Sequence, residues 1–403
     1  MIDICDKTKC CGCAACVQRC PKQCITMQAD KEGFSYPVVD TSACVGCGLC
    51  EKVCPVINKG DVREPKAVYA AKNCDEKVRL QSSSGGVFTI LAEQVIKAGG
   101  VVFGVRFNEE WDVVHSYTET IEGLAAFRGS KYVQSCIGDS YKQAEVFLKQ
   151  GREVLFSGTP CQIAGLKCFL RKEYDNLLTV ECVCHGVPSP KVWQGYLDDV
   201  KRQQGVDGKN TISSISNGMP VITGIHFRDK SNGWKKFGFH LGLKSAIGAD
   251  QNSVSTLCMS TSLLTPFYDN PFMRAFLADF ILRPSCYNCP AKAGRSEADI
   301  ALADFWGIEN VLPQFDDDRG CSLVLDYTSR AVYEKECDIV PAAYEDAVKY
   351  NPAIVCSVAK PQNRAFYFHR FNKGRGCVGA LGDTLSTGFL MRIYRVIFRK
   401  IFK

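Results

Sequence analysis

Apolar residues between positions 67 and 107 change from a strand pattern to a helical one and back. Residues 67–71 (AVYAA) form an apolar run of strand length. Residues 87–98 place apolar side chains at helical spacing, and Gly99 and Gly100 follow as a stop signal. The next apolar run, 101–107, again has the length of a strand. The pattern predicts a strand, a loop, a helix and a strand.

A second copy of this order follows further along the chain. Residues 154–156 predict a short strand, Pro160 suits the first position of a helix over 162–170, and residues 177–183 predict the next strand. Such alternation is typical of an α/β layer with mostly parallel strands. Residues 212–243 are rich in glycine and strand-forming residues, and we expect an irregular α+β segment there.

Cysteine spacing organises the first 60 residues. The run Cys-x2-Cys-x2-Cys-x3-Cys-Pro occurs twice, which is the pattern of bacterial two-cluster ferredoxins, where the last cysteine of each run ligates the other cluster. Soft thiolates suit a 4Fe-4S cubane, and two copies in register disfavour structural zinc. We therefore expect one cluster on Cys10, Cys13, Cys16 and Cys54, and a second on Cys44, Cys47, Cys50 and Cys20.

Composition and charge narrow the class of protein. The 403 residues are 46% hydrophobic and 23% charged, which is ordinary for a globular chain of two or three domains. Twenty-four cysteines without a signal peptide predict a reducing cytoplasm. The net charge of +6 comes from residues 359–403, where ten Lys and Arg and one Asp give +9 and leave −3 elsewhere. Because bound clusters add negative charge, we do not expect a nucleic-acid partner.

The C-terminal segment has its own pattern. Apolar residues repeat at helical spacing from Leu385 to Ile401, with Arg and Lys between them. We expect an amphipathic helix that packs on its own domain, although a peripheral contact with an anionic membrane or an acidic partner would suit the same pattern. We divide the chain into a ferredoxin-like domain (1–60), two parts of an α/β body (66–150 and 151–345) and a basic tail (346–403).

Two turns before predicted helices have the chemistry of phosphate sites. Residues 82–86 (SSSGG) offer hydroxyls and two positions without a Cβ, so a nucleotide pyrophosphate could approach the backbone N–H groups of the helix at 87–98. A helix cap followed by a flexible loop explains this segment equally well. Residues 130–132 (SKY) would add a cation and a stacking ring, although an exposed lysine beside a core tyrosine is more common.

Four further cysteines could hold a third cluster. Cys161 lies in the first turn of a helix after a strand, where amide dipoles favour a thiolate that could be a nucleophile or a ligand. Cys184 follows the next strand, and Cys286 and Cys289 form a Cys-x2-Cys pair. Zinc or buried structural cysteines explain this spacing equally well, and Cys182 is an alternative to Cys184.

The remaining cysteines have no ligand spacing. We expect small apolar residues at Cys5, Cys11, Cys24, Cys74, Cys136, Cys168, Cys258, Cys321, Cys337, Cys356 and Cys377.

Together these motifs resemble the coenzyme F420 hydrogenase/dehydrogenase beta-subunit family, in its form with a fused N-terminal ferredoxin domain. The resemblance runs from about Thr8 to Val324. Besides the two cysteine runs, it depends on SSSGG at 82–86, GSKY at 129–132, GTPCQ at 158–162, CHGVPSP at 184–190, RPSCYNC at 283–289 and ADIALADFWG at 298–307. It implies a combined α+β and α/β fold: a small two-cluster ferredoxin-like domain, an α/β body that binds flavin and a cluster, and the C-terminal helix.

The resemblance also implies cofactors and their ligands. It implies FAD and one 4Fe-4S cluster in the body, and it makes Cys161, Cys184, Cys286 and Cys289 the preferred ligands of that third cluster. It assigns the flavin to residues of three turns: Ser83, Ser84, Gly85, Gly86, Ser130, Lys131, Gly158, Thr159 and Pro160.

We therefore expect an oxidoreductase that passes electrons between ferredoxin-type clusters and FAD, with hydride transfer to or from coenzyme F420 or another organic substrate. His185 is the candidate proton donor, although a structural histidine is the commoner case. The expected partner is a redox protein such as ferredoxin, or a larger complex. The alternatives are an electron-transfer subunit without its own substrate and a ferredoxin-dependent reductase that uses no deazaflavin, because the family also resembles reductases of chlorophyll metabolism.

Overall fold

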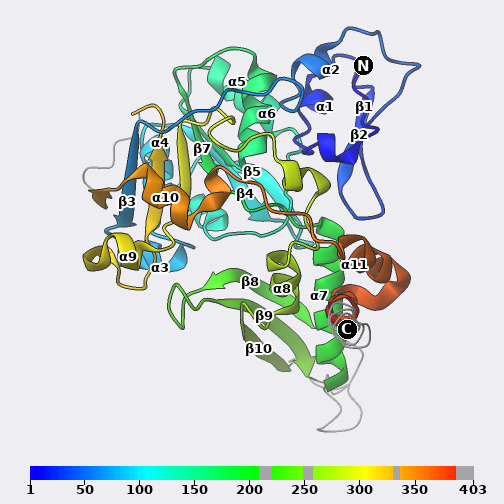
Figure 1. Ribbon diagram of the computed structural model, residues 1–403, viewed down its shortest axis with the longest axis vertical. Coiled ribbons are helices and arrows are strands. Elements are labelled where there is room, and N and C mark those ends of the chain that lie inside the picture. The colour runs from blue at the N-terminus through cyan, green and yellow to red at the C-terminus, as the bar shows by residue number, and fades with distance from the viewer. Residues whose placement is uncertain (208–219, 248–256, 330–335, 387–403) are drawn as a thin grey trace, which may run out of the picture.

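An eight-stranded sheet forms the centre of the computed structural model, which describes residues 1–207, 220–247, 257–329 and 336–386 (Figure 1). The strands lie in the order β13-β3-β12-β11-β7-β6-β4-β5. Their bounds are β3 (Ala67–Asn73), β4 (Val101–Phe107), β5 (Val113–Thr118), β6 (Val154–Gly158), β7 (Leu177–Cys182), β11 (Ile300–Asp304), β12 (Ser322–Asp326) and β13 (Cys337–Pro341).

The sheet is mixed, and the predicted parallel direction holds for five of its eight strands. The pairs β4–β6, β6–β7 and β7–β11 are parallel. The pairs β4–β5, β11–β12, β12–β3 and β3–β13 are antiparallel. Strand β5 pairs with β4 and β12 pairs with β11, in each case the strand that precedes it along the chain. An antiparallel connection of this kind needs no helical crossover. Since β3 remains parallel to β11, the carboxyl ends of β3, β4, β6, β7 and β11 still meet at one edge.

The helices predicted in the body are present and cover both faces of the sheet. Helix α4 (Val87–Lys97) packs on the side chains of Val102 and Leu155. Helices α5 (Ser140–Lys149) and α6 (Pro160–Leu170) pack on Phe103 and Phe156. These side chains are adjacent in sequence to Val102 and Leu155 and therefore point to the other face of the sheet. The shorter helical elements of the body are α3 (Glu76–Gln81), η2 (Glu122–Phe127), η4 (Pro284–Asn288), α9 (Ile308–Val311), η5 (Pro313–Phe315) and η6 (Pro352–Ile354).

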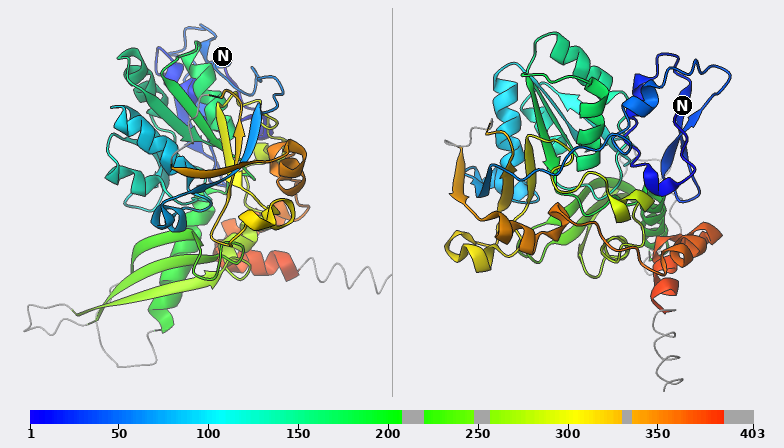
Figure 2. Two further views of the ribbon diagram at one scale, coloured as in Figure 1. Left: turned by 90° about the vertical axis from the view of Figure 1, so that its left-hand side faces the viewer. Right: turned by 45° about the horizontal axis from the view of Figure 1, so that its top comes forward.

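A second, three-stranded sheet is inserted between β7 and β11 along the chain. It consists of β8 (Val221–Asp229), β9 (Gly238–Ile247) and β10 (Leu257–Pro266), all antiparallel, with α7 (Pro190–Asp207) and α8 (Pro271–Leu277) against it (Figure 2). Its core is aromatic, and the rings of Trp193 and Phe272 lie 5.0 Å apart. The prediction of irregular structure was therefore wrong for the described part of 212–243, because alternating aromatic residues such as Phe237 and Phe239 bury one face.

The ferredoxin-like module packs against one side of the body, beside α5 and α6 (Figures 1 and 2). It contains η1 (Lys7–Lys9), α1 (Ala15–Arg19), α2 (Leu49–Lys52) and the antiparallel pair β1 (Ile25–Ala29) and β2 (Ser35–Val39). Arg19 pairs with Glu145 of α5 at 3.2 Å, and the Gln18 side chain accepts a hydrogen bond from the Tyr141 amide. The module and the body therefore share one interface with buried polar contacts.

Residues 344–386 pack back onto the molecule. Helices α10 (Tyr344–Tyr350) and α11 (Arg364–Arg370) and the π-helix η7 (Phe371–Arg375) are followed by helical residues 376–386. Tyr367, Phe368 and Phe371 enter the aromatic core beside α7. Almost all of the predicted amphipathic helix, from residue 387 onward, lies outside the described residues.

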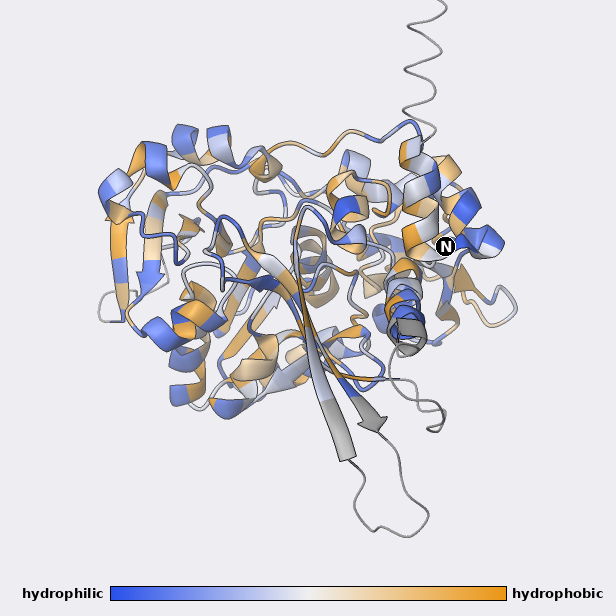
Figure 3. Cartoon of the chain, turned by 90° about the horizontal axis from the view of Figure 1, so that it is seen from below, coloured by the Kyte–Doolittle hydropathy of each residue, from blue (hydrophilic) through white to orange (hydrophobic). Residues whose placement is uncertain are grey.

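Hydropathy follows this layering. Figure 3 shows apolar residues concentrated in the strands of the large sheet and polar residues on the outer sides of the surrounding helices. Among the described residues, no helix is both long and apolar enough to cross a bilayer.

A glycine of α6 sets how closely the ferredoxin module approaches. A Cβ at Gly165 would stand 2.8 Å from the Cys13 Cβ and 2.9 Å from the Tyr141 hydroxyl. We predict that Gly165→Ala lowers the free energy of unfolding by about 1–3 kcal/mol, because an extra carbon is forced into a packed interface. Anaerobic urea unfolding measures it. The matched change Gly382→Ala, in a helical segment with no atom within 4 Å of the added carbon, should not destabilise the protein.

Candidate functional site

The eight cysteines of the two runs line two hollows in the ferredoxin module. Cys20, Cys44, Cys47 and Cys50 line the first, which encloses about 370 Å³ of space open to solvent. Cys10, Cys13, Cys16 and Cys54 line the second, of about 330 Å³. Of these eight thiols, each hollow takes three from one run and the last from the other, and each is also lined by one cysteine outside the runs, Cys24 in the first and Cys11 in the second. This is the crossed grouping that the spacing predicts.

The two hollows differ in their exposure to solvent. In the first, which we name the outer set (Cys20, Cys44, Cys47, Cys50), Cys47 is exposed. In the second, the inner set (Cys10, Cys13, Cys16, Cys54), every thiol is buried. The outer set therefore faces solvent and the inner set faces the body.

Cys11 connects the inner set to the body. Its thiol neighbours the thiols of Cys13 and Cys161, which are the two largest influences on its pKa, and the residue is buried. The sequence predicted a small apolar residue here, and burial agrees with that prediction. The structure adds a neighbouring thiol that spacing could not indicate, because Cys161 belongs to α6 and lies far along the chain.

The four body cysteines, which we name the body set (Cys161, Cys184, Cys286, Cys289), come from three elements and influence one another. Cys161 lies in the first turn of α6, Cys184 follows β7, and Cys286 and Cys289 lie in and after η4. Burial is the main cause that raises the pKa of Cys286 to about 12 and of Cys289 to about 11, and nearby Cys161 raises both further. Within the described residues, no three Cys, His, Asp or Glu groups converge tightly enough for a single metal ion.

The predicted low-pKa thiolate at Cys161 was wrong. The neighbouring Cys11 thiol and burial raise the pKa of the Cys161 thiol well above its usual range, although Thr159 and Arg283 act in the opposite direction. The neighbouring thiol and desolvation together therefore outweigh the stabilisation of a thiolate by the helix dipole. A neutral, buried thiol is a poor nucleophile but an ordinary metal ligand, because coordination removes its proton.

Cys182, the alternative to Cys184, lies apart from the body set. It is an exposed residue at the end of β7. Desolvation, Glu181 and Asp304 raise the pKa of its thiol and Lys131 lowers it, and no other cysteine is among these causes. Cys184, in contrast, is affected by Cys161 and by the η4 pair. The structure favours Cys184 as the fourth member of the body set.

The three turns predicted to hold a flavin are brought together by residues 128–136. The Ser83 hydroxyl accepts hydrogen bonds from the Ser130 amide at 2.6 Å and from its hydroxyl at 2.9 Å. Gln162, whose side chain also accepts from the Thr159 amide, donates to the Ser135 hydroxyl at 2.9 Å. The serine loop, the Lys131 turn and the turn before α6 therefore form one continuous surface at the carboxyl edge of the sheet, where α/β folds bind nucleotides.

Lys131 is a half-buried cation without an acidic partner among the described residues. Its ammonium group donates to the backbone oxygens of Arg128 at 3.0 Å and Gly129 at 3.2 Å. Burial lowers its pKa to about 8, and the neighbouring Cys182 acts in the opposite direction. Such a group would gain from a bound anion.

The serine–glycine loop differs in detail from the prediction. Gly86, with a φ of 84°, is the N-cap of α4, and no serine side chain caps this helix. Gly85 is needed because a Cβ would stand 2.3 Å from the Ala71 oxygen of β3. Its amide donates to the Ser322 hydroxyl at 3.0 Å. The glycines therefore serve the packing of the loop on the sheet, and Ser83 is the loop residue that contacts the Lys131 turn.

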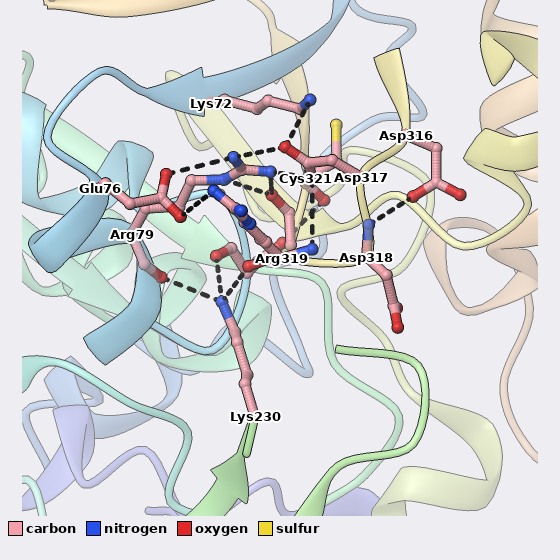
Figure 4. A network of polar contacts seen from close by, with 12 residues as sticks. Lys72, Glu76, Arg79, Lys230, Asp316, Asp317, Asp318, Arg319 and Cys321 are labelled. Carbon is pink, nitrogen blue, oxygen red and sulfur yellow. Dashed lines mark hydrogen bonds and ion pairs between the residues drawn. The ribbon is translucent and has the colours of Figure 1, made fainter. Parts of the chain in front are cut away.

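A polar network holds this loop in place (Figure 4). Arg79 of α3 donates to both oxygens of Asp317 and to the Gly320 oxygen. Lys230 donates to the Ser84 oxygen at 2.7 Å, and burial lowers its pKa to about 7. These interactions link α3, β8 and the segment before β12, so the loop is shaped without a ligand.

His185 is tied to a carboxylate. Its Nε2 lies 2.6 Å from Asp279 Oδ1, and its ring meets Phe276 edge-on. The side chain is 37% exposed. The structure thus gives His185 an orienting partner next to Cys184.

Several functional candidates could not be recognised from the sequence. Glu181, Lys292, Gln134 and Arg283 are charged or amide residues that the fold places among the thiols. Lys292 is buried and donates to the Cys184 oxygen. Glu181 is buried on β7, and burial raises its pKa to about 7. A charged residue within an otherwise apolar strand, as in LLTVEC, was the available signal for Glu181.

A ferredoxin-type module with two thiol-lined hollows, joined to an α/β body, defines an iron–sulfur oxidoreductase. Comparison with known families agrees. Residues 9–58 match the 4Fe-4S dicluster domain, residues 68–139 the N-terminal domain of the coenzyme F420 hydrogenase/dehydrogenase beta subunit, and residues 151–333 its C-terminal domain. The chain belongs to the coenzyme F420 hydrogenase/dehydrogenase beta-subunit family, in the form with a fused N-terminal ferredoxin domain.

Among solved structures, the chain is similar to one in the F420-reducing [NiFe] hydrogenase complex from Methanosarcina barkeri. The identity is 16%, the match covers 72% of this chain and 91% of that chain, and the TM-score is 0.43. No curated protein matches the chain.

Glu181 should make stability depend on pH. Its pKa of about 7 lies above the ordinary value near 4.3, so the folded protein binds more protons between these values and loses stability as the pH rises through them. We predict that Glu181→Gln removes this loss and stabilises the protein at pH 8 by on the order of 3 kcal/mol. Anaerobic urea unfolding from pH 5 to pH 8 measures it. Glu173→Gln, at a carboxylate with 83% exposure, is the control and should keep the wild-type slope.

Proposed function

We propose that this protein is an iron–sulfur flavoenzyme that exchanges electrons with a redox partner and transfers hydride to or from an organic substrate. Three 4Fe-4S clusters and one FAD would connect the two. The observation that carries the proposal is the position of the Cys11 thiol, which neighbours both Cys13 of the inner set and Cys161 of the body set. It brings thiols of the two domains close together.

The three sets of thiols are ordered from the surface inward. The outer set, with exposed Cys47, would meet the partner. The inner set and the body set would follow, and Thr159, whose hydroxyl lies 3.3 Å from the Cys161 thiol, leads to the flavin turns. The buried thiols are neutral in the free chain, so cluster assembly would release their protons. We propose the outer, inner and body sets as the ligands of three separate clusters.

The flavin would bind where residues 128–136 join the serine loop to the turn before α6. Ser83, Ser130 and Lys131 offer hydroxyl, amide and ammonium donors to its phosphates, and Gly158, Thr159 and Pro160 lie beside the body set. When bound, a flavin supplies the conversion between one-electron and two-electron transfer. His185 remains our candidate proton donor, and Asp279 would hold its ring in place.

The substrate and the setting are proposals of the same kind. Coenzyme F420 is named in the family description and is our first candidate for the substrate, and another organic acceptor would suit the same site. The family is described as a beta subunit, which supports assembly with a partner such as ferredoxin or with a larger complex. Free thiols at the described cysteines support a reducing cytoplasm.

The iron content of the protein tests whether the body set holds a third cluster. We predict about twelve irons and one FAD per wild-type chain, and about eight irons in Cys161→Ser, because a cubane that lacks one thiolate is lost. Cys168→Ser is the matched control: Cys168 also lies on α6 but has no ligand role, so about twelve irons should remain. Iron and flavin assays of anaerobically purified protein measure both. Eight irons and no flavin in the wild type would contradict the proposal. Reduction of a soluble acceptor by the photoreduced chain would exclude the alternative of an electron-transfer subunit without its own substrate.

The affinity for FAD tests whether Lys131 binds the phosphates of the flavin. Its ammonium group should favour the pyrophosphate, so we predict that Lys131→Ala weakens FAD binding about 10- to 100-fold, the value of one charged hydrogen bond. Because the pKa of Lys131 is about 8, wild-type affinity should fall as the pH rises above 8, and the variant should lose this dependence. Fluorescence titration of the flavin-depleted protein measures it. Lys142→Ala, on the exposed side of α5, is the control, and equal affinities in all three proteins would contradict the assignment.

A further inference from the structure

Arg283 is a buried cation between the ferredoxin module and the body. Its side chain is 1% exposed, and it precedes Cys286 by three residues. The guanidinium donates to the Cys10 oxygen at 2.7 Å, the Ser35 oxygen at 2.9 Å and the Gln134 side-chain oxygen at 3.0 Å. One of its nitrogens lies 3.6 Å from the Cys10 thiol itself. Arg283 therefore touches a ligand candidate of the inner set.

The charge of Arg283 is not balanced by a carboxylate. Its partners among the described residues are carbonyl oxygens, an amide oxygen and a thiol, and its guanidinium also lies 4.4 Å from the Tyr36 ring centre. Arg364, a second buried arginine at the same interface, instead forms an ion pair with Glu32 at 2.7 Å. A buried charge without a counter-ion is costly. Arg283 thus lacks the anion that its position requires.

The anions that could balance Arg283 are the thiolates on both sides of it. Cys10 of the inner set is in contact, and η1, which immediately precedes Cys10, packs against η4, which carries Cys286 of the body set. Arg283 also favours the ionised forms of Cys161 and Cys286. A cubane with four thiolates is anionic, and each added electron makes it more so. No residue of the outer set is among the groups that Arg283 contacts in the described structure.

We propose that Arg283 is the shared counter-ion of the inner and body clusters, and that it raises the reduction potentials of both relative to the outer cluster. The part that concerns the body cluster rests on the proposed function above. One electron taken up at either site adds one negative charge beside the guanidinium, the donor centre loses one electron, and no covalent bond or proton changes place. Arg283 is a positioning residue in this scheme, because it touches a cluster ligand and not a substrate.

Redox titration of the anaerobic holoprotein, followed by electron paramagnetic resonance, tests the proposal. In Arg283→Gln, reduction of the inner and body centres should become at least tenfold less favourable, which is a shift of about 59 mV to more negative potential for a one-electron couple. The outer centre should keep its potential, and Cys47→Ser in each background identifies its signal. Arg283→Lys, which keeps the charge, should retain most of the wild-type potential of both centres.

Arg364→Gln is the matched control, because Arg364 joins the same two parts of the protein but is paired with Glu32. It should leave all three potentials unchanged. Where Arg283→Gln fails to hold iron, Gln134→Glu places a carboxylate against the intact guanidinium and should produce the same negative shift.

Two results would overturn the proposal: wild-type potentials in both Arg283→Gln and Gln134→Glu, or an equal shift of all three centres, which would show a general structural effect. A wild-type chain with eight irons would remove the body cluster and the proposed function. The reduction potential of the inner centre would then still test the part of the proposal that concerns Arg283 and the inner cluster.

Discussion

The close approach of the ferredoxin module to α6 is the constraint that brings the inner set and the body set together. The Cys11 thiol neighbours that of Cys161 at this interface, and Gly165 of the same helix leaves room for Cys13. Helix α6 directly follows β6, which lies between β7 and β4 inside the sheet. A small shift of the module would separate the inner set from the body set. The packing of the two domains and the closeness of the inner set to the body set therefore depend on the same few residues.

Residues 128–136 play a similar connecting role on the other side of the body set. This segment contacts the serine loop through Ser130, the turn before α6 through Ser135, and the ferredoxin module through Gln134, which donates to the Cys11 oxygen. It has little regular secondary structure of its own, and its shape is set by these partners. A change in any one of the three regions would thus be transmitted to the other two.

Local sequence patterns predicted the parts of the fold that local interactions determine. β3, α4, β4, β6, α6 and β7 follow the apolar period, and the two cysteine runs line hollows with the expected grouping. The position of β12 between β3 and β11 could not be predicted, because it depends on pairings between distant strands. The same limit hid Arg283, which lies 273 residues from Cys10, and Cys11, whose partner is on α6. Spacing along the chain shows which thiols can converge, but not which charges will surround them.

The crossed arrangement of the hollows makes the two repeats depend on each other. Since each hollow borrows its last thiol from the opposite repeat, through Cys54 in one case and Cys20 in the other, neither repeat alone encloses a complete set of four. If either repeat were removed, both hollows would lack at least one of their four thiols.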